Sequence, residues 1–85
     1  MSIKKCWYIT HFINGNHSST HSMLRTKGEV LQHLNLSTKQ HLGTTLSDIH
    51  IKKLFMTTGG FVSVQDEDGA IHTWVVDQLE YNANV

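Results

Sequence analysis

The 85-residue chain contains no proline and only one cysteine, Cys6. A single cysteine cannot form an intramolecular disulfide or supply a multi-cysteine zinc site, which excludes a disulfide-stapled domain and a zinc finger of that kind. No apolar run approaches the roughly 20 residues of a membrane-spanning helix, and no signal-length apolar run follows the first lysines. We therefore expect one domain, residues 1–85, in the cytoplasm and without a membrane partner.

Charge is also scarce, at 16% of the residues, but it is unevenly distributed. All seven lysines and arginines precede Leu54, whereas five of the seven acidic residues follow it, so the formal charge is +5 before Leu54 and −5 from there on. Six of the seven histidines also lie in the basic part. Such asymmetry is typical of a surface that attracts anions or docks in one orientation, and it suggests self-association as a further alternative.

A β-hairpin is the first structural signal. Residues 6–13 are rich in aromatic and β-branched side chains, and the following Asn14-Gly15 suits the two positive-φ positions of a type I′ turn. The first strand is apolar on both faces, which predicts an interior position, while the second is rich in Ser, Thr and His and suits a sheet edge.

The middle of the chain predicts one short helix and, less distinctly, a strand. Thr26 and Glu29 have capping-box spacing, so we place a helix from Lys27 to about Asn35, with a separate helical turn near residues 37–42. Residues 49–57 match both a helical face and strand alternation. Their short length and the Gly-Gly that follows favour a strand.

A second hairpin is predicted near the C-terminus. Residues 61–64 and 71–76 flank Asp66-Glu67-Asp68-Gly69, and pairing Asp66 with Ala70 leaves a three-residue loop with Gly69 in the left-handed position. The segment from Phe61 to Glu80 resembles the closing hairpin of small SH3-like barrels. That resemblance implies a binding fold and no more, and it assigns the chain to no family.

The spacing of the histidines does not favour a metal site, and no arrangement of Cys, Ser and His residues indicates a catalytic site. His17 and His21 would lie about 13 Å apart along a strand, too far to share an ion, and His11 would point to the opposite face. We expect it to be hydrogen-bonded in a packed site. Cys6 most simply packs as a small hydrophobe, and three acids at a hairpin tip read as turn residues. We expect no enzyme activity, no catalytic residue, no metal and no cofactor.

A small basic and aromatic surface is the strongest binding signal. In the simplest hairpin register Lys4 is opposite Arg25 and Tyr8 is opposite His21, all on one face. Phosphates and exposed bases are held by this combination of residue types. The candidate partner-binding or nucleic-acid-binding residues are Lys4, Lys5, Tyr8, His21, Arg25 and Lys27.

The sequence thus predicts an α+β domain: a small, mostly antiparallel sheet of two β-hairpins plus a middle strand, with one short helix packed on it. We expect a non-catalytic protein-binding module that acts as a small inhibitor or regulator of a larger, unidentified protein partner. The alternative is a nucleic-acid-binding protein that uses the basic N-terminal half on RNA or single strands. A homo-oligomer is a further expectation. The predicted core is Trp7, Ile9, Ile13, Leu24, Val30, Leu31, Leu34, Leu54, Val62, Val64, Trp74 and Val76.

Overall fold

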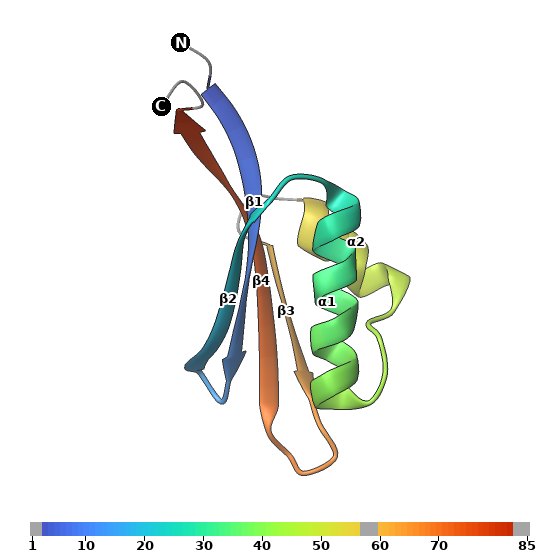
Figure 1. The fold of residues 1–85 in the computed structure, drawn as a ribbon. Helices are drawn as coiled ribbons and strands as arrows, with labels where there is room; N and C mark the ends of the chain where they lie inside the picture. The colour runs from blue at the N-terminus through green and yellow to red at the C-terminus, as the bar shows by residue number, and fades with distance from the viewer. Residues whose placement is uncertain (1–2, 57–59, 83–85) are drawn as a thin grey trace.

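The computed structural model describes residues 3–56 and 60–82 of the chain and contains a sheet with two helices packed on one face (Figure 1). The described elements are β1 (Ile3–Ile13), β2 (Asn16–Leu24), α1 (Lys27–Leu42), α2 (Asp48–Met56), β3 (Gly60–Gln65) and β4 (Ile71–Asn82). The α+β class and the antiparallel sheet are as predicted. None of the described helices is long and apolar enough to cross a membrane.

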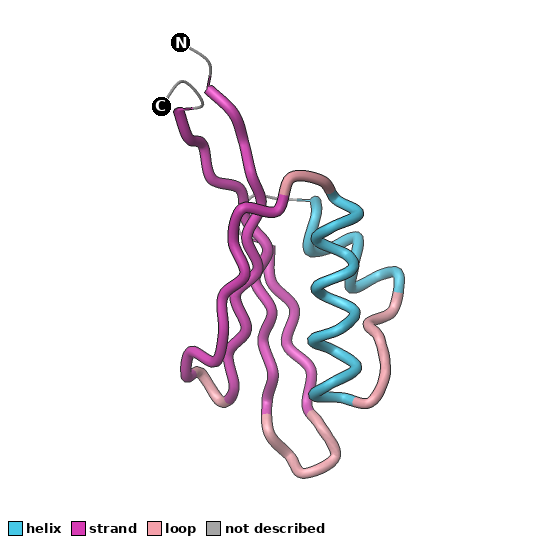
Figure 2. The backbone as a smooth tube through the Cα atoms, viewed as in Figure 1, coloured by secondary structure: helices cyan, strands magenta, loops and turns pink. Residues whose placement is uncertain are grey.

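The four described strands form an antiparallel sheet in the order β2-β1-β4-β3. The interior position of β1 and the edge position of β2 confirm the reading of the first hairpin. The strand order is open, with β2 and β3 at its edges, so the described residues do not close into an SH3-like barrel. Strands β1 and β4 run past the helices, and the start of β1 and the end of β4 lie on the same side of the molecule (Figure 2).

Both hairpin turns form as predicted. Asn14 and Gly15 have φ of 51° and 82°, the positive values of a type I′ turn. In the second hairpin the Asp66 amide donates to the Ala70 carbonyl at 2.8 Å, and Gly69 has a φ of 89°.

Helix α1 is longer than the prediction that it ends near Asn35. Its N-cap is confirmed, because the Thr26 hydroxyl accepts from the Glu29 amide at 3.1 Å. Glu29 accepts from the Arg25 amide instead of the Thr26 amide. The helix then continues without a break to Leu42, and Gly43 ends it in the left-handed conformation. Buried Leu34 and Thr38, one helical turn apart, keep the second half of the helix on the sheet.

The predicted middle strand is wrong, since Asp48–Met56 forms α2. Ser47 starts this helix by accepting from the amides of His50 and Ile51. Leu54 is fully buried, and Ile51 and Phe55 pack partly against the same core. The spacing in this segment is therefore that of a helix with one apolar face. This face packs on the apolar side of the sheet.

The core lies between the sheet and the helices. Most predicted members are buried or packed against it, and Leu46 joins them from the loop before α2. Three polar side chains are also buried there: His11, Thr38 and His72. Cys6 is buried, with its Sγ 3.7 Å from the Met23 Sδ, in agreement with its expected packing role.

Candidate functional site

The predicted basic and aromatic surface does not assemble, because the register of the first hairpin shifts twice. The β1 and β2 ladder starts with Ile13 opposite Asn16, but irregularities between His11 and Phe12 and between Trp7 and Ile9 each displace the pairing. His21 is consequently opposite Ile9. Successive strand residues point to opposite faces, so each extra residue on one strand changes which side chains share a face.

Tyr8 and His21 therefore lie on different sides of the sheet. The Tyr8 hydroxyl donates to Asp77 Oδ2 at 3.2 Å. Burial raises the Tyr8 pKa above its ordinary value of 10.0, and the charge and hydrogen bond of Asp77 raise it further. The His21 ring instead lies 4.9 Å from the His33 ring of α1, on the helical side.

The four predicted cations are also dispersed. Lys4 and Lys5 lie opposite Tyr81 and Glu80 of β4, so the basic start of the chain runs beside its acidic end. Arg25 follows β2 without a partner in the ladder. Lys27 begins α1, where its Nζ lies 5.7 Å from the centre of the Phe55 ring. The charge separation seen along the sequence is thus not a separation in space along β1 and β4.

The structure instead reveals an open apolar face. We call the side of the sheet away from α1 and α2 the outer face; no described element covers it (Figure 1). Successive strand residues alternate between the two faces, and the opposite, helix-covered face carries the buried side chains of Ile9, Val62, Trp74 and Val76. Its apolar side chains come from three strands and are half-buried or exposed: Tyr8, Phe12, Phe61, Ile71, Val75 and Leu79.

A second feature is a cluster of three histidines between the sheet and the end of α1, which we call the histidine cluster: His11 of β1, His41 of α1 and His72 of β4. One ring nitrogen from each lies within 4.8 Å of the others. The His11 and His72 rings are parallel within 5°, and the His41 ring centre is 4.4 Å from that of His11. Trp74 stacks on His11 at 4.8 Å and forms one wall.

Hydrogen bonds assign the protons in this cluster. Asp66 Oδ2 accepts from His72 Nε2 at 2.8 Å, so a neutral His72 presents Nδ1 as an acceptor. His11 Nε2, 2.9 Å from that Nδ1, is then the donor. The remaining nitrogen of His11, Nδ1, is buried and has no hydrogen-bond partner in the described part of the chain. Among the described residues, the buried His11 ring is thus held by one hydrogen bond, through Nε2.

The surroundings keep His11 neutral and Asp66 charged. Burial, together with the smaller effects of the charges of His41 and His72, lowers the His11 pKa from 6.5 to about 4. The hydrogen bond from His72 lowers the pKa of the Asp66 carboxyl below 3.8, an effect that burial opposes. The amides of Asp68 and Ala70 also donate to Asp66 Oδ1, both at 2.9 Å. Neutral imidazoles with a fixed carboxylate partner are the state in which histidine binds metals.

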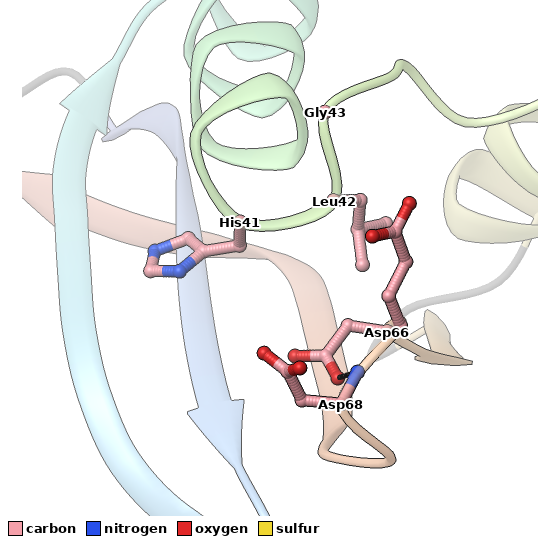
Figure 3. Close-up of a pocket in the computed structure, with 6 residues that line it drawn as sticks. His41, Leu42, Gly43, Asp66 and Asp68 are labelled. Atoms are coloured by element: carbon pink, nitrogen blue, oxygen red, sulfur yellow. Dashed lines mark hydrogen bonds between the residues drawn. The ribbon is translucent and has the colours of Figure 1, made fainter.

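An open cavity of about 250 Å³ adjoins the cluster. His41 projects from the end of α1 at one side of it, with Asp66 and Asp68 in the turn between β3 and β4 below (Figure 3). Leu42, Gly43 and Glu67 complete the lining. His41 also borders a groove of about 490 Å³ along β2 and α1, which contains His21 and His33.

Sequence reasoning missed the histidine cluster because its members are 30 and 31 residues apart in a chain without a local motif. The expectation for His11 was a hydrogen-bonded, packed site, and this is confirmed. Only the pairing of β1 with β4, which places His11 beside Trp74 and Ile13 beside His72, brings the cluster together. A usable signal was His72 itself, a polar residue at an inward position of the predicted second hairpin.

Comparison of the chain with models of protein families, with curated proteins and with solved structures finds no match in any of the three. The function must therefore be inferred from the chemistry of these surfaces.

Proposed function

We propose that the protein is a non-catalytic protein-binding module that acts as a small inhibitor or regulator of a larger partner and docks through its outer face. The observation that carries this proposal is the exposure of Phe61, Ile71 and Leu79, which are 55%, 49% and 50% exposed on the sheet face away from the helices. From α2, Lys53 reaches this face with its Nζ 6.0 Å from the centre of the Phe61 ring. Large apolar side chains grouped on an open face are typical of interaction sites.

The composition of the outer face favours a protein partner. Aromatic residues are enriched at protein interfaces, and Tyr8 and Phe12 add two rings to that of Phe61. Charge there is sparse, and Asp77, which accepts from Tyr8, is acidic. A phosphate backbone would meet this carboxylate next to the ring on which a base would stack, which disfavours the RNA alternative.

The test uses the purified chain and matched surface variants of it to capture a protein partner, and it compares the affinity of that partner for each. Phe61→Ser with Leu79→Ser removes two exposed apolar groups from the outer face, and Ile49→Ser, at a residue 78% exposed on α2, is the control. We expect a saturable protein partner that binds the wild type and the control and loses at least tenfold in affinity for the double variant. Equal binding by all three would exclude this face.

The same preparation distinguishes the alternatives. Size-exclusion chromatography with light scattering, at low and high salt, reports the mass and the ultraviolet absorbance ratio. Nucleic acid that co-elutes at low salt and leaves at high salt would favour the RNA function. A dimer that the double variant abolishes would identify a second copy of the chain as the occupant of the outer face.

A further inference from the structure

We propose that His11, His41 and His72 form a binding site for a divalent transition-metal ion of the zinc class, with Asp66 as the carboxylate that orients His72. The proposal is independent of the docking function and concerns the opposite side of the sheet.

The donor set has the required chemistry. Three imidazole nitrogens from three elements converge within 4.8 Å. Three histidines are a known zinc ligand set, and such sites keep a fourth position for water. His41 borders the open cavity beside the cluster, so solvent has access to that position.

The hydrogen bond between His72 and Asp66 is the second argument. Histidines that bind a metal through one nitrogen commonly donate the other N–H to a carboxylate, which fixes the tautomer and the ring. His72 Nε2 makes this bond at 2.8 Å, and its Nδ1 faces His11 as a hydrogen-bond acceptor. Asp66 is itself held by the amides of Asp68 and Ala70.

The geometry needs a small adjustment to accept the ion. Nitrogens about 2.0 to 2.1 Å from a tetrahedral zinc are about 3.3 Å apart. The nitrogens of His11 and His72 are 2.9 Å apart and share a proton, which must move to Nδ1 of His11 before Nε2 can bind the ion. The largest separation in the cluster, at most 4.8 Å, must shorten. Rotation of His41, which is half-buried, can supply that movement.

A further feature favours a cation at this point. The cavity beside His41 is lined by the three carboxylates of the turn between β3 and β4, Asp66, Glu67 and Asp68, which lower the electrostatic cost of a divalent ion.

The experiment is a zinc titration of the untagged chain by isothermal calorimetry in a non-chelating buffer near pH 7.5. We expect one Zn²⁺ per chain. His41→Ala should weaken binding at least tenfold, and Asp66→Asn, which keeps all three ligands, should weaken it by about ten- to a hundredfold. His33→Ala, at a residue that faces His21 in the neighbouring groove, is the control and should bind as the wild type does.

Two readouts separate loss of the site from loss of the fold. Circular dichroism checks that each variant is folded, and Co²⁺ in place of Zn²⁺ should give the visible absorption of a four-coordinate site in the wild type and in His33→Ala but not in His41→Ala. Absence of zinc binding by the folded wild type would overturn the proposal. So would binding that survives His41→Ala or is lost in His33→Ala, since the ion would then occupy another histidine pair.

Discussion

His72 and Asp66 connect the interior of the sheet to the hairpin turn at its edge. The His72 imidazole is buried in β4, and its Nε2 donates to Asp66 Oδ2 at 2.8 Å across a span of six residues. The same carboxylate accepts from two amides of its own turn. One side chain thus fixes both the conformation of the turn and the orientation of a buried ring.

The first prediction concerns this carboxylate. Asp66→Asn should lower the urea midpoint of unfolding at pH 7, because a neutral amide is a weaker acceptor for His72 and for the turn amides. Asp68→Asn, in the same turn but with an exposed side chain, is the matched control and should leave the midpoint unchanged. Equal effects of the two substitutions would show that general charge at the turn, not the bond to His72, matters.

His11 should make stability depend on pH. Its pKa is about 4 in the folded protein, whereas an unfolded histidine titrates near 6.5. Between these pH values the unfolded chain binds more protons than the folded protein does. The contribution of neutral His11 to the free energy of unfolding is therefore complete above about pH 6.5 and is lost as the pH falls toward 4. The loss is at most about 1.4 kcal/mol per pH unit.

Urea unfolding at pH 7.5, 6 and 5 measures this dependence. His11→Phe keeps a ring against Trp74 but removes the titrating group, and it should flatten the profile. His17→Phe, at an exposed residue of β2, should keep the wild-type slope. A slope that is the same in His11→Phe and the wild type would assign the effect to another group.

Two glycines should respond to alanine in opposite directions. A Cβ on Gly60 would lie 2.7 Å from the Leu54 carbonyl oxygen and 2.9 Å from that of Lys53, so Gly60→Ala must push α2 away from β3 and should cost about 1 to 3 kcal/mol. A Cβ on Gly28, in the first turn of α1, would lie at ordinary contact distance, 3.7 Å, from Thr26 Oγ1, so Gly28→Ala should add up to about 1 kcal/mol. Denaturant unfolding of both variants measures the difference, and a neutral Gly60→Ala would disprove the close approach.

Ser37 should anchor α1 to the sheet through Trp74. The indole Nε1 of this fully buried residue donates to Ser37 Oγ at 2.9 Å. Ser37→Ala would leave the donor unpaired and should reduce the free energy of unfolding by about 1 to 3 kcal/mol. In a Trp74→Phe background the same substitution should cost nothing, because the donor is gone. A double-mutant cycle that shows no coupling would contradict this role.

The local pattern was sufficient for the hairpins but not for the register of the first one. Asn14-Gly15 and the Asp66 turn specify their conformations within a few residues, so both were predictable. The two register shifts lie opposite residues 17–19 and 21–24 of β2, and the second includes Met23, which has a φ of 61°. A shift of one residue in the pairing is enough to place Tyr8 and His21 on different faces, so the predicted basic and aromatic surface does not form.

Helix α2 shows the same limit. The spacing of Ile49, Ile51 and Phe55 fitted a strand, whereas Ile51 and Phe55 with Leu54 fitted a helical face. The choice depends on which partner buries Leu54. By itself, the sequence determined the α+β class, the two turns, the start of α1 and most of the core, because each follows from contacts between near neighbours. Only the tertiary structure decided that β1 pairs with β4, which brings His11 and His72 together. It also decided that both helices pack on one face, which places His41 beside them and leaves the outer face open.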